Sequence, residues 1–396
     1  MHKKAITSLS ILFFMMGFIT CLNDILVPYL KAVFHLDYGQ AALIQFCFFG
    51  AYGLASIPSS KIIERLGYNK GMIIGFGITA LGCLLFFPAV SLHIYGLFLF
   101  ALFILASGIV MLQVAANPYV SVIGTKETAS SRLTMVQAFN SFGTFLAPFF
   151  GSYLILNSLD KTTDAGAVRY PYLLIAAVLV IIAILLNRLK LPEIKPEGAA
   201  TISWKKVMKE PCLIYGMIGI FSYVGAEVAI GSFLVNYVIE LTPMPETEAA
   251  TLVAIYWGGA MVGRFLGIYT LKEFSPGRVL AVHAILALAL ILISVNSTGI
   301  LSVYSMILVG LCNSIMFPTI FTFGIKDLAP GEEHIGSGLL ATAIIGGAFI
   351  PVITGQMVDR AGFRIAFLIP VICYAYIAFL GFKNAGTKAP SIQRSH

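Results

Sequence analysis

The sequence predicts an all-α membrane protein with twelve transmembrane helices in two pseudo-symmetric six-helix bundles. Three observations predict this fold. The 396 residues are 59% hydrophobic and 11% charged, with a mean hydropathy of +0.92, whereas a soluble domain carries about 25% charged residues. Twelve apolar runs are long enough to cross a bilayer, which needs about 20 residues in a helix. The first six runs and the last six also share motifs.

The apolar runs predict helices rather than strands, because a membrane-spanning strand has only about 9–11 residues. The first run continues past Asp24 without a small-residue cleavage site, so we expect a helix there and not a signal peptide. The twelve runs cover residues 6–31, 41–63, 71–90, 94–123, 133–157, 171–189, 212–239, 249–271, 278–295, 299–325, 335–358 and 363–383.

A polar interval divides the runs into six and six. Residues 187–211 contain three prolines and six Lys or Arg residues, a composition typical of a linker. We therefore expect three parts, which are an N-terminal bundle (1–190), a cytoplasmic linker (191–211) and a C-terminal bundle (212–396).

The two halves contain related segments. The stretches "NPYVSVIGTKE" (117–127) and "FPTIFTFGIKD" (317–327) share Pro, Gly, Lys and an acidic residue in the same register. Several matches in register argue against chance. Two related six-helix halves around a central site are typical of a secondary transporter.

The basic residues predict the orientation in the membrane. Of the 25 Lys and Arg residues, all but Lys31, Lys161, Arg169, Arg360 and Arg364 fall on the side of the N-terminus. Because basic loops stay in the cytoplasm, we expect both termini to be cytoplasmic, in a multi-pass protein of a bacterial inner membrane. This distribution also accounts for the net charge of +7 without a nucleic-acid partner.

Four runs carry a polar side chain about midway. These are Asp24, Gln113, Glu227 and Asn313, in runs 1, 4, 7 and 10. An ionisable group at that depth usually faces the bundle interior or an aqueous cavity. No Lys or Arg lies at the depth of Asp24 in the first six runs, so we interpret Asp24 as functional rather than structural.

Further polar residues line single helix faces near these positions. Gln113 and Asn117 are one turn apart and share a face, as Gln137, Asn140 and Thr144 largely do on the fifth run. The alternative is that they only form interhelical hydrogen bonds, which stabilise membrane bundles. That alternative applies most directly to Thr144.

Trp257 lies in the middle of a run instead of at the interfacial belt that Trp residues favour. Beside Tyr256 and two glycines, it is placed either to stack on a sugar ring or simply to pack in the bundle. We find no nucleophile–base pair and no nucleotide-binding loop, so the sequence predicts neither an enzyme nor an ATP-driven pump.

Several motifs resemble a known family. The stretch "SKIIERLGYNK" (60–70) is similar to the cytoplasmic signature of the major facilitator superfamily, with Ser60 in place of the usual opening glycine. "LNDILVPYLK", "QVAANPYV", "QAFNSFGT" and "FPTIFTFGIKDL" resemble its fucose–proton symporter branch, which includes glucose/galactose permeases. The resemblance covers nearly the whole chain. It implies a two-bundle fold with alternating access and import of a monosaccharide with a cation.

The resemblance also implies residue roles. In the fucose type, the residue matching Asp24 carries a proton and the residue matching Asn140 binds the sugar. A glutamate is needed in the fourth helix, where this chain has Gln113, and an amide does not titrate. That departure, together with "GAEVAIGSF" (225–233), looks more like the sodium-dependent glucose/galactose permeases.

Two forms of cation coupling follow for Asp24. Desolvation favours binding of a proton by a carboxylate, whereas neutral oxygens around it favour sodium. We favour sodium, with Asp24 and Gln113 as its predicted ligands and no other cofactor. The predicted cation-coupling residues are Asp24, Gln113, Asn117, Asn140 and Thr144.

The expected substrate is a hexose such as glucose or galactose, or fucose, carried by a monomer in the lipid bilayer. The alternatives are a proton-coupled fucose-type symporter, a drug–proton antiporter or a passive uniporter of the same fold. Glu64 and Arg65 are predicted to act in gating at the cytoplasmic ends. The predicted substrate-binding residues are Asn23, Gln137, Asn140, Glu227, Trp257 and Asn313.

Overall fold

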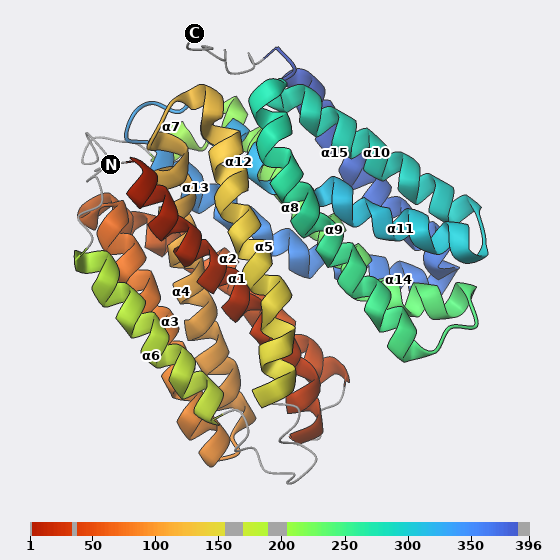
Figure 1. Cartoon of the computed structure of the whole chain (residues 1–396), viewed down its shortest axis with the longest axis horizontal. Helices are drawn as coiled ribbons and strands as arrows, with labels where there is room; N and C mark the ends of the chain where they lie inside the picture. The colour runs from red at the N-terminus through yellow and green to blue at the C-terminus, as the bar shows by residue number, and fades with distance from the viewer. Residues whose placement is uncertain (1, 34–37, 155–168, 189–203, 387–396) are drawn as a thin grey trace. The chain divides into compact units, whose positions relative to one another are not determined.

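The structure is a computed structural model, which describes all residues except 1, 34–37, 155–168, 189–203 and 387–396. The described part of the chain contains helices and no strand, which confirms the predicted all-α class. The α-helices (Figure 1) are α1 (His2–Val33), α2 (Tyr38–Leu66), α3 (Tyr68–Ser91), α4 (Tyr95–Val122), α5 (Ala129–Leu154), α6 (Arg169–Arg188), α7 (Trp204–Val207), α8 (Pro211–Leu241), α9 (Glu246–Glu273), α10 (Pro276–Asn296), α11 (Gly299–Asn313), α12 (Met316–Ile325), α13 (Glu333–Thr342), α14 (Gly346–Ala366) and α15 (Leu368–Lys383).

Each of the twelve predicted runs corresponds to helical structure. Among the described residues, 9 helical segments are long and apolar enough to cross a membrane. Shorter apolar helical stretches, Ile6–Cys21 of α1 and Leu368–Lys383, account for the first and last runs, and α5 accounts for the fifth. The predicted number of membrane helices is therefore confirmed.

The tenth and eleventh runs are each broken, which their sequence does not predict. The tenth run divides into α11 and α12 around Ser314 and Ile315, and a 3-10 turn at Ala343–Ile345 separates α13 from α14. Near the end of α14, Gly362 has φ 78°, a conformation that favours glycine. The residues at the second break are as apolar as their neighbours, and the short polar stretch Asn313–Ser314 at the first break is flanked by apolar residues, so hydropathy shows one uninterrupted run at each.

The chain forms two compact units, and both combine residues from the two halves of the sequence. The first unit consists of Met1–Val120, Phe139–Met208 and Leu328–Thr342, and the second of Ser121–Ala138, Lys209–Asp327 and Ala343–His396. The predicted domain limits stay a prediction.

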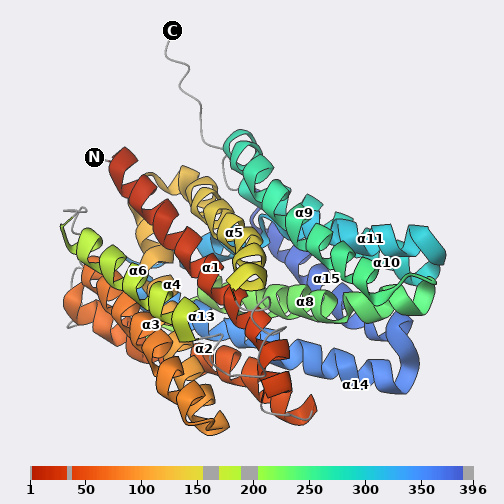
Figure 2. The same cartoon turned by 60° about the horizontal axis from the view of Figure 1, so that its bottom comes forward.

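In the first unit, α3 contacts α6 and α2, and α13 contacts α2. Figures 1 and 2 both show α3 and α6 side by side. Helices α3 and α4 approach closely because glycines face the contact. A Cβ atom on Gly82 would lie 2.4 Å from the backbone nitrogen of Leu105, so no larger residue fits there.

In the second unit, α8 lies among five other helices. It packs against α9, α11, α12, α14 and α15. Helices α9 and α11 also approach closely, because a Cβ atom on Gly310 would lie 2.1 Å from the carbonyl oxygen of Tyr256. This packing holds the middle of α8, α9 and α11 close together.

Candidate functional site

Glu227 is a buried carboxylate near the middle of α8, with 9% of its surface exposed. Tyr223 lies one turn earlier on the same face, and its hydroxyl donates to Oε1 of Glu227 over 2.6 Å. Arg264 lies on α9, which packs against α8. An ionisable group in a membrane interior needs such partners, so the surroundings of Glu227 are those of a functional group.

A chain of hydrogen bonds extends from Glu227 to two other helices and beyond. The Tyr256 hydroxyl of α9 donates to the backbone carbonyl of Glu227 over 3.3 Å. It accepts a bond of 2.8 Å from Nδ2 of Asn313, at the end of α11. The Tyr374 hydroxyl of α15 donates to Oδ1 of Asn313 over 2.6 Å. The fully buried Asn313 amide therefore holds two tyrosines in place.

The break between α11 and α12 has side-chain partners for its carbonyl groups. Nε of Arg264 donates to the Ser314 carbonyl over 3.3 Å, and Nδ1 of His283 lies 3.0 Å from the Cys312 carbonyl. Nη1 of Arg264 also donates to the Gln137 carbonyl of α5 over 3.4 Å. Backbone groups released where a membrane helix breaks need such partners.

Arg264, Tyr223, Tyr256 and Tyr374 belong to the candidate site, and the sequence analysis predicted a role for none of them. The charge count placed Arg264 with the cytoplasmic cations, but it lies inside α9. Tyr223 precedes Glu227 by one helical turn, and this spacing was the available signal. Tyr256 was noted only as the neighbour of Trp257, and Tyr374 gave no signal, because their bonds to Asn313 depend on how separate helices pack.

Trp257 is 38% exposed on α9, and its indole meets the Tyr256 ring nearly edge-on, with centroids 5.2 Å apart at 80°. The structure thus places Trp257 next to the tyrosine that binds the Glu227 backbone. Of the predicted substrate-binding residues, Glu227, Trp257 and Asn313 gather around Tyr256. Their binding roles stay predictions.

The predicted ion-coupling residues of the N-terminal half are partly described. Asn23 and Asp24 belong to α1, but their side chains lie outside the described residues. Nε2 of Gln113 donates to the Tyr52 hydroxyl over 3.0 Å, and Asn117 is buried one turn further along α4. No group of three or more His, Cys, Asp or Glu residues within the described ranges is placed to hold a metal ion. The sodium ligands Asp24 and Gln113 therefore stay a prediction.

Asn140 and Thr144 of α5 bond to the backbone of α1. Nδ2 of Asn140 donates to the Phe13 carbonyl over 3.0 Å, and Oγ1 of Thr144 lies 3.3 Å from the Gly17 carbonyl. A Cβ atom on Gly17 would lie 2.0 Å from the Asn140 carbonyl oxygen, so the two helices touch here. Both side chains make the interhelical bonds of the alternative interpretation, and Gln137 is buried on the same helix.

The predicted gating residues lie at the end of α2. Oε2 of Glu64 is 3.8 Å from Nε2 of His334 at the start of α13. The neighbouring Ser60 hydroxyl donates to the His334 carbonyl over 2.7 Å. Arg65 is exposed. Glu64 thus contacts a residue from the second half of the sequence, whereas Arg65 points to the surface.

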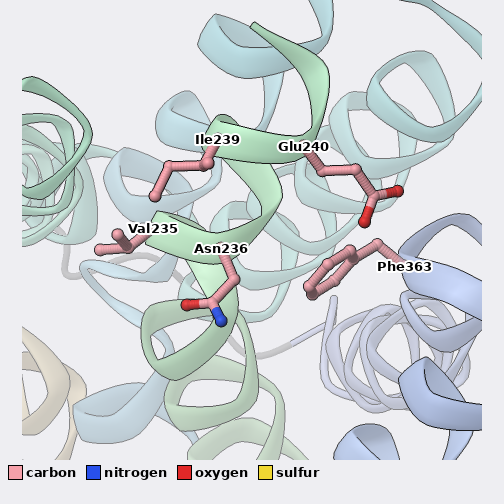
Figure 3. A pocket seen from close by; sticks show the side chains of 5 residues that line it. All are labelled: Val235, Asn236, Ile239, Glu240 and Phe363. Atoms are coloured by element: carbon pink, nitrogen blue, oxygen red, sulfur yellow. The ribbon is translucent and has the colours of Figure 1, made fainter. Parts of the chain in front are cut away.

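A cavity of about 420 Å³ lies further along α8 (Figure 3). None of the predicted site residues lines it. Its lining residues are Val235, Asn236, Ile239, Glu240 and Phe363. The candidate site is therefore defined by the hydrogen-bonded cluster around Glu227 and Tyr256, and not by this cavity.

Twelve membrane helices in two related halves, with buried polar groups at broken helices, define a secondary transporter rather than an enzyme. The family model described as "Major Facilitator Superfamily" matches residues 9–344. The chain belongs to the major facilitator superfamily.

Curated relatives match almost the full chain. It is 50% identical to a "Glucose/galactose transporter" of Brucella abortus, over 95% of this chain and 93% of that one. It is 43% identical to a "Putative glucose/galactose transporter" of Helicobacter pylori, over 97% of each. It is 35% identical to the "L-fucose-proton symporter" of Escherichia coli, over 94% of this chain and 91% of that one.

A solved structure agrees with this assignment. The transporter FucP in its outward conformation superimposes with a TM-score of 0.88 at 33% sequence identity, over 96% of this chain and 98% of that chain. The resemblance found in the sequence motifs is confirmed at the level of the family and of the fold.

Proposed function

We propose that this chain imports a monosaccharide by cation-coupled symport and alternating access. The observation that carries the proposal is the buried Glu227 cluster, in a chain 50% identical to a protein named a glucose/galactose transporter. A neutral sugar has many hydroxyl groups, which need donors and acceptors when they leave water. Carboxylate, tyrosine and amide groups at mid-membrane depth meet this need.

The proposed sugar site combines polar groups with one aromatic ring. Glu227 accepts hydrogen bonds from sugar hydroxyls, and Trp257 covers an apolar face of the pyranose ring. Asn313 acts through Tyr256, since both ends of its amide are already bonded. Asn23, Gln137 and Asn140 contribute from the N-terminal half.

Asp24 is the proposed carrier of the coupling ion, and two ions are candidates. The proton is supported by the name of the Escherichia coli relative, an L-fucose-proton symporter at 35% identity. Sodium is supported by Gln113, because an amide oxygen is a ligand for sodium and does not titrate. Asn117, Asn140 and Thr144 would complete the ion's surroundings.

The proposed location is a bacterial inner membrane with both termini in the cytoplasm. The distribution of Lys and Arg supports this orientation. In that orientation the inward movement of one positive charge down about 100 mV contributes about 2.3 kcal/mol, enough for roughly 50-fold accumulation of a neutral sugar. We propose that a single chain suffices for transport.

Uptake by purified protein in proteoliposomes tests the proposal. Labelled D-glucose, D-galactose and L-fucose are offered under an inward sodium gradient at equal pH, under an inward proton gradient without sodium, and with no gradient. We expect accumulation above equilibrium under one gradient, abolished when an ionophore dissipates it. The gradient that drives accumulation identifies the ion.

The same assay separates the alternative functions. A passive uniporter would exchange labelled sugar without accumulating it. A drug–proton antiporter would take up none of the three sugars, and unlabelled sugar would not compete with its substrates. Either result would contradict the proposal.

A further inference from the structure

Trp257 occupies an unusual place for a tryptophan in a membrane protein. It lies in the middle of α9 and keeps 38% of its surface exposed, whereas most such residues sit at the membrane interface. The chain has only 2 Trp residues. The contacts that hold the indole in this position therefore bear on the candidate site.

Gly231 of α8 provides the surface on which the indole rests. A Cβ atom on Gly231 would lie 2.8 Å from Cζ2 of Trp257, and 3.5 Å and 3.7 Å from Cε2 and Cη2. Contacts below 3.0 Å do not occur between real atoms of this kind, and the six-membered part of the indole is rigid. Any side chain at position 231 would therefore displace the ring.

Gly231 also connects the indole to Glu227. The two residues are four positions apart on α8, so they share a helix face about one turn apart. On α9, Tyr256 is fixed by its bonds to the Glu227 carbonyl and to Asn313. The Trp257 ring thus lies between Tyr256, which is held by hydrogen bonds, and the backbone of α8 at Gly231. The buried carboxylate of Glu227 is one turn away on α8.

We propose that Gly231 is a positioning residue for sugar recognition, which seats Trp257 beside Glu227. The indole then covers the apolar C–H face of a pyranose while the Glu227 carboxylate accepts bonds from its hydroxyls. Aromatic rings and carboxylates in this arrangement serve a ligand with one apolar face and several hydroxyls. The inference rests on the proposed function, and it adds Gly231, which has no side chain, to the candidate site.

The experiment uses a Trp204→Phe background, in which Trp257 is the remaining tryptophan. Trp204 lies on α7, where its ring meets Lys61. Affinity for the transported hexose is measured by labelled-sugar binding, and Trp257 emission is recorded in the same titration. We expect emission to change in a saturable way, at the concentration where the sugar binds. Unchanged emission at saturating sugar would overturn the proposal.

The Gly231→Ala variant tests directly whether Gly231 positions the Trp257 ring, and Gly258→Ala is its matched control. A Cβ atom on Gly258 meets nothing within 4 Å, although this glycine directly follows Trp257. We expect Gly231→Ala to weaken sugar affinity about tenfold, in line with loss of one aromatic contact, and Gly258→Ala to leave it unchanged. Equal sugar affinity in the parent and in Gly231→Ala would refute the proposal that Gly231 positions Trp257.

A double-mutant cycle separates positioning from simple helix packing. A phenyl ring is shorter than an indole and leaves room for a methyl group at position 231. We expect Trp257→Phe to weaken affinity on its own, and Gly231→Ala to add no further loss in that background. A loss of the same size in both backgrounds would mean that Gly231 only packs α8, and would overturn the proposal.

The outcomes also distinguish this inference from the proposed function. If the parent binds none of the three hexoses, the proposed function fails. If the parent binds sugar but the cycle shows no coupling between positions 231 and 257, the inference fails and the function stands. Where Gly231→Ala yields no folded protein, the double variant Gly231→Ala/Trp257→Phe decides, since a folded double variant supports a clash between position 231 and the indole and an unfolded one overturns the proposal.

Discussion

The imidazole of His334 lies against the carboxylate of Glu64, with Nε2 3.8 Å from Oε2. His334 is fully buried, and the Ser60 hydroxyl binds its carbonyl group. The contact joins α2, from the first half of the sequence, to α13, from the second half, inside one compact unit. It is the described contact through which the predicted gating residue Glu64 reaches another helix.

We expect Glu64→Gln to lower the apparent Tm of the detergent-solubilised protein by about 2 °C, because the partly exposed Glu64 contributes roughly 1 kcal/mol at most. His334→Gln should lower it further, because His334 is fully buried. The double variant should lose less than the two single variants together, since the first change already removes the pair. Thermal unfolding followed by fluorescence measures all three. Strict additivity would mean that the two residues do not interact.

Arg65→Gln is the control for this cycle. Arg65 follows Glu64 directly but is exposed at the end of α2, so we expect its Tm to equal that of the parent. A loss as large as that of Glu64→Gln would mean that charge at this helix end matters, and not the contact with His334.

Asp24→Asn should abolish concentrative uptake while leaving sugar exchange between the two sides of the membrane. An amide neither takes up a proton nor offers a charge to sodium, so the ion gradient no longer drives the sugar. Accumulation and counterflow are measured on the same proteoliposomes. A variant that still accumulates sugar against its gradient would show that Asp24 is structural.

Glu227→Gln should weaken sugar binding by roughly 10- to 100-fold, the range expected for loss of a hydrogen bond to a charged group. Cation binding in the absence of sugar should remain, because we place the ion on the other half of the chain. Binding of labelled sugar and of the coupling ion are measured separately. Loss of cation binding with unchanged sugar affinity would reverse the two assignments.

Tyr374→Phe should lower stability more than it lowers sugar affinity. Removing the hydroxyl leaves Oδ1 of the buried Asn313 without its 2.6 Å bond, which costs about 1–3 kcal/mol. Tyr256 keeps its bond from Nδ2 of Asn313, so the site should remain largely intact. Apparent Tm and sugar affinity are compared with those of Glu227→Gln. A larger affinity loss than in that variant would place Tyr374 in direct contact with the sugar.

The number and order of membrane helices followed from the sequence, because a 20-residue apolar run has few other stable states in lipid. The breaks at Ser314 and at Ala343–Ile345 did not follow. Hydropathy measures transfer into lipid, and apolar residues at a break transfer as well as those in a helix. A break depends on partners from other helices, such as Arg264 on the Ser314 carbonyl.

The acidic and amide groups of the candidate site were predictable from the sequence, whereas Arg264 and the contacts between the groups were not. Glu227 and Asn313 were visible, since polar groups are rare and costly in apolar runs. The tyrosines that bind them were not, because a Tyr in a membrane helix is common and its partner depends on tertiary packing. Gly231 gave no signal of its own, since its role depends on a ring from a different helix.

Gln113 is the position at which this chain departs from the fucose-type pattern. Its Nε2 donates to the Tyr52 hydroxyl over 3.0 Å. A glutamate fits the same place, because a tyrosine hydroxyl is both donor and acceptor and can donate to a carboxylate instead. Gln113→Glu should therefore fold, and its effect on coupling can be measured.

If sodium drives uptake by the parent, we expect Gln113→Glu to shift the coupling toward the proton. Two carboxyl groups in one site of low dielectric do not both ionise easily, so the pair formed with Asp24 should hold a proton near neutral pH. Sugar accumulation by this variant should then rise as the external pH falls from about 8 to about 6, in steps that follow titration of a carboxyl pair, while a sodium gradient drives it less than in the parent. Parent and variant are compared under each gradient, with Gln113→Leu as the control that removes the amide without adding an acid. If folded Gln113→Glu keeps the parent's preference between the two ions, Gln113 lies outside the ion site and only bonds Tyr52.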